Sequence, residues 1–219
     1  MKNYRGIYMY EHAVDNEQIK IGVMGGTFDP IHYGHLAAAE AARVEFGLRK
    51  VIFMPAGSPP HKWLKEISDA EHRYRMTVLA ISSNSGFEVS RLEVDKSGIS
   101  YTIDTMKQLK KTYGEASDIY FIIGADTVME LLTWHKIGEL LTLCKFIAVT
   151  RPGFNSRKME QMIEEISSKY NEEIICLEVP LLEISSTDIR ERIKNGRSVK
   201  YLLPEEVEAY IHEKGLYKE

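Results

Sequence analysis

Residues 25–35 read GGTFDPIHYGH, and with their flanking segments they indicate both the fold and a candidate binding site. This stretch follows an apolar run at 19–24, which predicts a buried strand, and it leads into residues 36–44, whose alanines favour a helix. A strand, a glycine-containing turn and a helix, in this order, bring free backbone N–H groups and the positive end of a helix dipole to one point. The order therefore predicts a binding site for an anion such as a phosphate group.

Two histidines lie in this stretch. His32 and His35 are three residues apart at the expected start of the helix, so their side chains share a face and can reach one phosphate group. Gly34 lies between them and lets a ligand approach closely, because it has no Cβ. Gly25 and Gly26 are expected to form the tight turn that leaves the strand. Without this context, two such histidines would indicate only an ordinary helix start.

Composition excludes several classes of protein. The 219 residues are 44% hydrophobic and 27% charged, as in an ordinary soluble globular protein. A formal charge of −4 provides no general basic surface for nucleic acid. No apolar stretch is long enough to span a bilayer, and residues 1–10 lack the apolar core of a signal peptide. We expect a cytoplasmic protein that binds neither nucleic acid nor membranes.

The chain contains two cysteines, Cys144 and Cys176, and both fall in apolar runs that resemble strands. We expect both to be buried and reduced. No Cys/His cluster has the spacing of a zinc site, so no metal site built from protein ligands is predicted.

Strands and helices alternate along the chain. Residues 1–18 have no clear period and are interpreted as an N-terminal extension, and 19–219 as a single domain. Strands are expected at 19–24, 50–54, 87–90, 119–123, 146–149 and 173–179, and helices at 36–44, 70–82, 102–112, 155–170, 186–195 and 204–214. Apolar strands separated by helices predict an α/β fold of Rossmann-like type, a doubly wound parallel sheet with helices on both faces. Ligands of such sheets bind beyond the carboxyl ends of the strands.

Two further segments follow strands. Residues 55–62, PAGSPPHK, end in Lys62, a point charge suited to phosphate, although alone they would indicate a proline-rich surface loop. Residues 121–126, FIIGAD, end a core strand. There Gly124 admits a close ligand, and Asp126 can either accept hydrogen bonds from ribose hydroxyls or cap a helix.

Two helix starts carry groups that can hold anions. The free N–H groups of residues 100–105, SYTIDT, suit a carboxylate, while Ser100 or Thr102 can also serve simply as the helix cap. Residues 184–190, ISSTDIR, combine the hydroxyls of a capped helix start with a guanidinium group one turn later. The alternative for this second segment is a capped helix with a solvated arginine.

The motif GGTFDPIHYGH resembles the HxGH signature of the nucleotidylyltransferase superfamily, and in its fuller form that of the bacterial nicotinate-nucleotide adenylyltransferases. The PPHK, SYTxDT, GxD, LxxW, ISSTxIR and LLPxxVxxYI motifs of that family follow in the family's order, so the resemblance covers about residues 19–217. No GxGxxG follows the first strand, so a dinucleotide bound as in dehydrogenases is not implied.

The resemblance implies transfer of the adenylyl group of ATP to nicotinate mononucleotide, giving deamido-NAD and pyrophosphate, with Mg²⁺ arriving on ATP. It implies catalytic roles for His32, His35 and Lys62. The residues it implies for ATP, besides the two histidines, are Gly25, Gly26, Thr27, Phe28, Gly124, Asp126, Ser186, Thr187 and Arg190. Those it implies for nicotinate mononucleotide are Lys62, Tyr101, Thr102, Trp134 and Arg151.

Other readings stay open from the sequence. The nearest is the same transfer to nicotinamide mononucleotide. Pantetheine-phosphate adenylyl transfer and glycerol-phosphate cytidylyl transfer share the HxGH motif, although Trp134 and residues 100–105 argue against the first of these. Trp134 can also be an ordinary core residue, as a lone tryptophan often is. A different class is a catalytically silent nucleotide sensor, and a homo-oligomer stays open as well.

Overall fold

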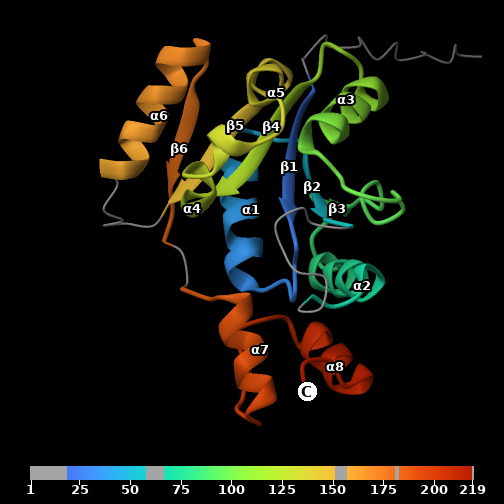
Figure 1. Cartoon of the computed structure of the whole chain (residues 1–219). Coiled ribbons are helices and arrows are strands. Elements are labelled where there is room, and N and C mark those ends of the chain that lie inside the picture. Colours follow the sequence, from blue (N-terminus) through green and yellow to red (C-terminus); the bar gives the residue numbers. More distant parts are fainter. Residues whose placement is uncertain (1–18, 58–66, 151–156, 181–182, 219) are drawn as a thin grey trace, which may run out of the picture.

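The computed structural model describes residues 19–57, 67–150, 157–180 and 183–218 (Figure 1). Within them, six parallel strands form one sheet in the order β3-β2-β1-β4-β5-β6. The strands are β1 (Lys20–Gly26), β2 (Lys50–Pro55), β3 (Phe87–Val89), β4 (Asp118–Gly124), β5 (Lys145–Thr150) and β6 (Ile174–Glu178). This confirms the predicted doubly wound sheet, and the strand order reverses between β1 and β4.

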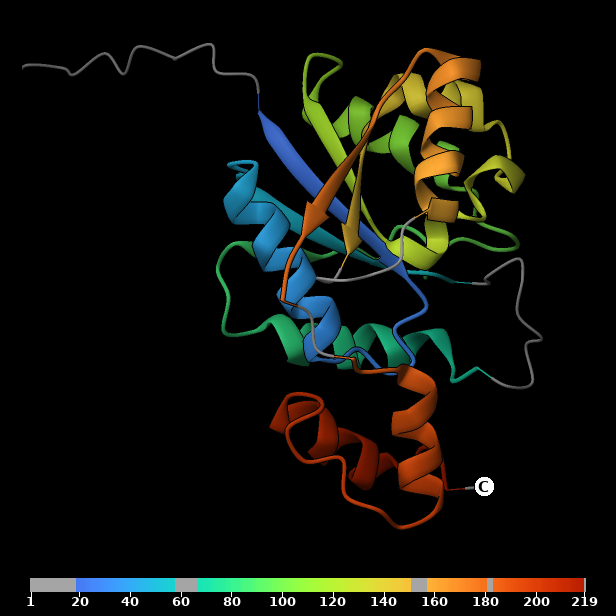
Figure 2. The same ribbon diagram turned by 90° about the vertical axis from the view of Figure 1, so that its left-hand side faces the viewer.

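Helices cover both faces of the sheet (Figure 2). One face packs against α1 (Tyr33–Glu45) and α2 (Ala70–Ile81), and the other against α3 (Thr102–Tyr113), α5 (Ile137–Leu143) and α6 (Arg157–Tyr170). The helices α7 (Ser186–Lys194) and α8 (Glu205–Lys214) lie beyond the carboxyl ends of the strands (Figure 1). No helix in the described ranges is both long enough and apolar enough to cross a membrane.

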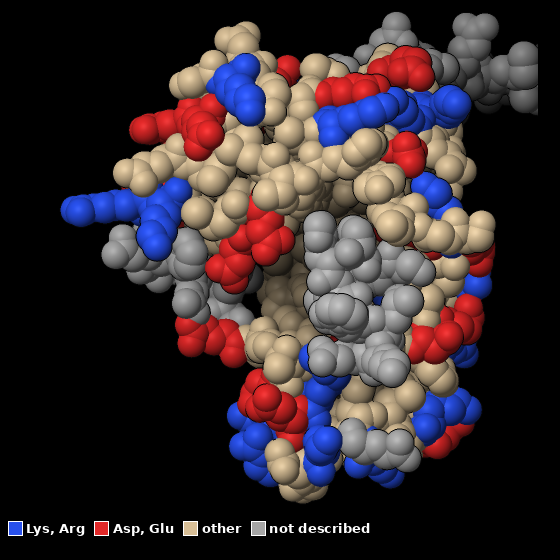
Figure 3. Space-filling view, viewed as in Figure 1, with Lys and Arg blue, Asp and Glu red and all other residues tan. Residues whose placement is uncertain are grey.

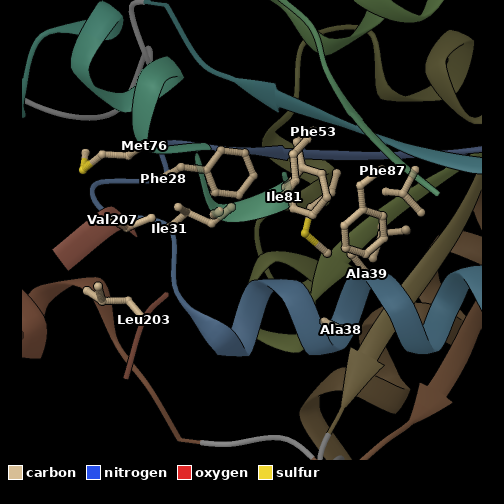
Figure 4. Packing of buried hydrophobic residues seen from close by; sticks show 14 of the residues in the cluster. Phe28, Ile31, Ala38, Ala39, Phe53, Met76, Ile81, Phe87, Leu203 and Val207 are labelled. Atoms are coloured by element: carbon tan, nitrogen blue, oxygen red, sulfur yellow. The ribbon is translucent and has the colours of Figure 1, made fainter. Parts of the chain in front are cut away.

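The apolar strands follow from burial on both faces. In β4, Phe121 and Ile123 point into the cluster beneath α3 and α5, whereas Ile122 points into the cluster beneath α1. The small residues Ala38 and Ala39 let α1 lie close to the sheet (Figure 4).

The glycines after the first strand correct one prediction. Gly25 and Gly26 do not form a turn; they continue β1, and neither has a positive φ. A Cβ added at Gly25 would lie 2.9 Å from the ring of Phe121, and one at Gly26 would lie 2.8 Å from the ring of Phe28. Glycine is needed at both positions because aromatic side chains pack directly against the strand.

The chain between β4 and β5 contains helices that the sequence patterns did not predict. They are α4 (Ala125–Val128), a 3₁₀ turn (Leu131–Thr133) and α5, each too short to show a helical period. In addition, α1 begins at Tyr33, three residues earlier than expected, because His32 takes the extended cap conformation with φ −150°. His35 therefore lies in the first turn of α1.

The prediction that both cysteines are buried is half wrong. Cys144 is buried, but it ends α5 instead of lying in a strand. Cys176 lies in β6 and is exposed. The reason is that β6 is an edge strand with one neighbour, β5, and is incompletely covered.

Candidate active site

A cleft of about 1020 Å³ opens where the strand order reverses. Its floor is made by the carboxyl ends of β1 and β4, and its walls by the start of α1, the start of α3 and the segment after α4. The hollow lies near the middle of the face in Figure 3, with acidic side chains gathered on one rim. This is the position at which doubly wound sheets bind their ligands.

The two histidines form a stacked pair at one end of the cleft. Their ring centroids are 3.8 Å apart with an interplanar angle of 26°. The backbone N–H of His32 donates to Nδ1 of His35 at 3.3 Å, so a neutral His35 carries its proton on Nε2. The ring of Phe28 meets that of His35 edge-on at 5.1 Å. His35 is thereby held in one tautomer with one free N–H donor.

Burial controls the charge of this pair. Burial lowers the pKa of His32 to about 4. Burial, together with the neighbouring His32, lowers the pKa of His35 well below its ordinary 6.5. Both rings are therefore neutral at pH 7 in the free protein and offer N–H donors, not cations. Nδ1 of His32 is buried and has no hydrogen-bond partner within the described ranges.

We expect the free energy of unfolding to fall as the pH drops from 6.5 towards 4. In this window unfolded His32 binds a proton but folded His32 does not, because its folded pKa is lowered to about 4. At about 1.4 kcal/mol for each pKa unit, the loss reaches about 3 kcal/mol. Urea titrations at several pH values measure it. His32→Asn should remove this part of the slope and His212→Asn, at an exposed position of α8, should not; an unchanged slope in His32→Asn would contradict the expectation.

The start of α7 lies against the loop that carries the histidines. Oγ of Ser186 donates to the carbonyl oxygen of Pro30 at 2.9 Å, and Nη1 of Arg190 donates to that of Asp29 at 2.7 Å. The helix cap is Ser185, whose Oγ accepts from the N–H of Thr187 at 3.2 Å. These contacts are long-range in sequence, so α7 and the histidine loop form one assembly.

A buried arginine joins the loops around the cleft. Arg73 of α2 is 1% exposed, and its guanidinium group donates to three backbone carbonyl oxygens: Nε to Ser68 at 2.9 Å, Nη1 to Thr27 at 2.8 Å and Nη2 to Gly57 at 2.9 Å. Sequence reasoning missed this residue. The available signal was its spacing of three from Met76, which places a charged residue on the apolar face of α2.

Gly57 is fixed from its other side as well. A Cβ added there would lie 2.1 Å from the backbone oxygen of Glu93. Gly57→Ala is therefore expected to destabilise the fold by about 2 kcal/mol or more, because backbone must move to relieve the clash. Thermal unfolding measures the loss. Gly124→Ala is the control for stability, since an added Cβ there has no neighbour within 4 Å; equal melting temperatures of the two variants would contradict the expectation.

Aromatic side chains line the other end of the cleft. Tyr101, at the start of α3, and His135 have ring centroids 4.4 Å apart. Trp134 is half-buried and meets the ring of Phe121 edge-on at 5.9 Å. The pair of Tyr101 and His135 is contributed by two distant segments. His135 lines the cleft and was not singled out from the sequence.

Carboxyl groups dominate the charge on the described walls. Glu93, Asp126, Glu130 and Glu183 line the cleft, whereas no lysine or arginine of the described ranges does. Glu93 accepts a hydrogen bond from Oγ1 of Thr105 at 2.7 Å, and burial raises the pKa of its carboxyl group. Within the same ranges, no group of three or more His, Cys, Asp or Glu side chains is arranged to hold a metal ion.

The structure brings most of the residues singled out in the sequence to this cleft. Those that line it are Gly25, Gly26, Thr27, His32, His35, Tyr101, Thr102, Gly124, Asp126 and Trp134. Ser186 and Arg190 bond to the histidine loop, and neither they nor Thr187 are among the residues that line the cleft. Phe28 is 2% exposed and belongs to the core. Lys62 and Arg151 lie outside the described residues.

Comparison with known proteins shows which family the sequence matches. The cytidylyltransferase-like family model matches residues 23–192. The probable nicotinate-nucleotide adenylyltransferase of Thermoanaerobacter sp. strain X514 is 55% identical over 201 residues, covering 92% of this chain and 95% of the relative. That of Moorella thermoacetica is 54% identical over 199 residues, covering 91% and 92%.

Solved structures share the fold. The Plasmodium falciparum nicotinic acid mononucleotide adenylyltransferase complexed with NaAD superposes with a TM-score of 0.75 at 22% identity, covering 91% of this chain and 98% of that one. The same enzyme complexed with APC gives a TM-score of 0.71 at 20% identity, with the same coverage. The family model and the sequence relatives show that the chain belongs to the cytidylyltransferase-like family and, within it, to the nicotinate-nucleotide adenylyltransferases.

Proposed function

We propose that this protein transfers the adenylyl group of ATP to nicotinate mononucleotide, forming deamido-NAD and releasing pyrophosphate. The observation that carries the proposal is the cleft itself. It has a pair of N–H donors at a helix N-terminus at one end and an aromatic wall at the other, across the ends of β1 and β4. A phosphate chain suits the first end and a planar pyridine ring the second.

The reaction needs no nucleophile from the protein. A phosphate oxygen of nicotinate mononucleotide attacks the α-phosphorus of ATP, and the bond from that phosphorus to the pyrophosphate oxygen breaks. The protein has to align the two phosphates and stabilise the negative charge that moves onto the leaving group.

The histidine pair suits the second task. The hydrogen bond at Nδ1 fixes the direction in which Nε2–H of His35 donates. This donor therefore needs little reorientation, and little free energy for it, as charge develops in the transition state. His32, stacked on it, offers a second imidazole to the same phosphates. The dipole of α1 adds a partial positive charge at the same point.

Other roles come from the family resemblance. Ser186, Thr187 and Arg190 are proposed to hold the β and γ phosphates, from a helix that already contacts the histidine loop. Lys62 is proposed to bridge the reacting phosphates, and Arg151 to contact nicotinate mononucleotide.

Magnesium is proposed to arrive with ATP. Enzymes of this kind commonly use a divalent cation, and the acidic wall of the cleft would repel a bare triphosphate. A cation carried by the phosphate oxygens removes that repulsion. Residues 19–219 acting as one nucleotidylyltransferase domain, the extension at 1–18, the cytoplasmic location and any homo-oligomer stay predictions.

The test is pyrophosphate release from Mg·ATP, measured with nicotinate mononucleotide and nicotinamide mononucleotide in parallel. A strong preference for the nicotinate form supports the proposal. Equal use of both would show that the pyridine end does not select a carboxylate. Release with neither substrate would reject the proposal, and tight ATP binding in that case would favour a nucleotide sensor.

A further inference from the structure

The end of the chain reaches back to the histidine loop. Oη of Tyr217 donates to Oδ1 of Asp29 at 2.6 Å, across 188 positions of sequence. The second carboxylate oxygen, Oδ2, accepts from the backbone N–H of Ser68 at 3.2 Å. Asp29 is 3% exposed and lies three residues before His32. Both oxygens of this buried carboxylate are therefore bound by residues outside the loop.

The backbone of Asp29 is fixed at the same time. Its carbonyl oxygen accepts from Arg190 at 2.7 Å. Ser68, which donates to the Asp29 side chain, also gives its carbonyl oxygen to Arg73, and Arg73 in turn binds the carbonyl oxygen of Thr27. A continuous chain of hydrogen bonds thus connects Tyr217 to both sides of residue 28.

The position of Tyr217 is itself specified by the fold. Gly215 ends α8 at φ +64°, and the N–H of Leu216 donates to the carbonyl oxygen of Ile211 at 3.0 Å. Tyr217 then takes φ +66°, a left-handed conformation that is unfavourable for a tyrosine. Such a conformation persists only where the surrounding contacts demand it. Burial raises the pKa of the Tyr217 phenol, so its hydroxyl stays protonated and donates.

Apolar packing supports the same link. Phe28 and Ile31, on either side of Asp29, pack with Met76 of α2, with Leu203, which precedes α8, and with Val207 in α8 (Figure 4). The loop thus rests on the helices that place Tyr217.

We propose that Tyr217 is a positioning residue for the histidine loop: through the carboxylate of Asp29, its hydroxyl fixes the backbone from which His32 and His35 project. The proposal rests on the proposed adenylyl transfer. Tyr217 is not among the residues that line the cleft and reaches it through the loop, so its loss should lower kcat more than it changes KM.

Tyr217→Phe tests this, with Tyr210→Phe as the matched control. Tyr210 lies in α8, and its hydroxyl is hydrogen-bonded to Nδ1 of His72 in α2 at 2.9 Å. Each variant therefore loses one phenol hydroxyl and the hydrogen bond that it makes between the C-terminal region and the rest of the chain. Only the hydroxyl of Tyr217 bonds to Asp29. We expect Tyr217→Phe to lower kcat by about tenfold or more, with the KM for nicotinate mononucleotide changed by less than about twofold. Tyr210→Phe should keep the kcat of the wild type.

Asp29→Asn extends the test. The amide oxygen of asparagine can still accept from Tyr217, but its amide nitrogen, a donor, then faces the backbone N–H of Ser68, which needs an acceptor. Asp29→Asn should therefore also lower kcat. The double variant with Tyr217→Phe should lose less than the product of the two single losses, because both act on one network. Multiplicative losses, or equal kcat values for Tyr217→Phe and Tyr210→Phe, would overturn the proposal.

Histidine ring NMR spectra of the full chain distinguish this failure from failure of the proposed function. If the wild type releases no pyrophosphate, the adenylyl transfer is rejected, while the ring signals still report on the loop. Tyr217→Phe should shift the signals of His32 and His35, and Tyr210→Phe that of His72 alone. Unmoved His32 and His35 signals in Tyr217→Phe would overturn the positioning role.

Discussion

Replacing His35 by alanine is expected to lower kcat by about two to three orders of magnitude, the usual effect of removing a fixed donor to transition-state charge. The ring that is lost donates from Nε2 and accepts from the N–H of His32 at Nδ1. Alanine removes both functions, so a loss of activity in this variant alone would not separate chemistry from loop structure. Initial rates with saturating Mg·ATP and nicotinate mononucleotide measure the effect.

His35→Asn separates the two functions. The amide oxygen of asparagine can stand where Nδ1 stands and accept from His32, but nothing replaces the Nε2 donor. We expect His35→Asn to unfold at a higher temperature than His35→Ala, and to have a kcat as low as that of His35→Ala. His35→Gln, whose amide nitrogen can approach the position of Nε2, should recover part of the rate. Turnover of His35→Asn at the wild-type rate would reject the donor role.

Replacing Arg73 by methionine is expected to destabilise the fold by about 3–5 kcal/mol, because three backbone carbonyl oxygens lose their donors in a site that is 1% exposed. Methionine fills most of the volume, so the loss reports on the hydrogen bonds more than on packing. The free energy of unfolding from urea titration measures it.

Two variants sharpen the arginine test. Arg75→Met, on the exposed side of the same helix, makes the same chemical change and should alter stability by less than about 0.5 kcal/mol. Arg73→Lys keeps the charge but lacks the planar fork that reaches three segments at once, so it should lie between the wild type and Arg73→Met. If Arg73→Met and Arg75→Met were equally stable, the three carbonyl contacts would not contribute to folding.

The fold class and the placement of His32 and His35 on one helix face could both be predicted from the sequence. Both depend on local rules: apolar strands alternate with helices, and residues three apart share a helix face. His32 takes an extended conformation and its ring stacks on that of His35. The two residues lie within one stretch of four, so their pairing depends on local structure. The short helices between β4 and β5 could not be predicted by the same local rules, because they contain too few residues to show a helical period.

The contacts that hold this site in place could not be predicted, because they join segments that are distant in the sequence. Gly25 and Gly26 looked like turn residues because nothing local reveals that aromatic rings lie against them. Phe28 belongs to the core, and Arg73 to the cluster that joins three loops. Tyr217 meets Asp29 across 188 positions, and such a contact leaves no trace in any window of sequence. Local sequence patterns therefore indicate which groups face the cleft. How firmly those groups are held depends on contacts between distant segments, and only the folded chain brings these segments together.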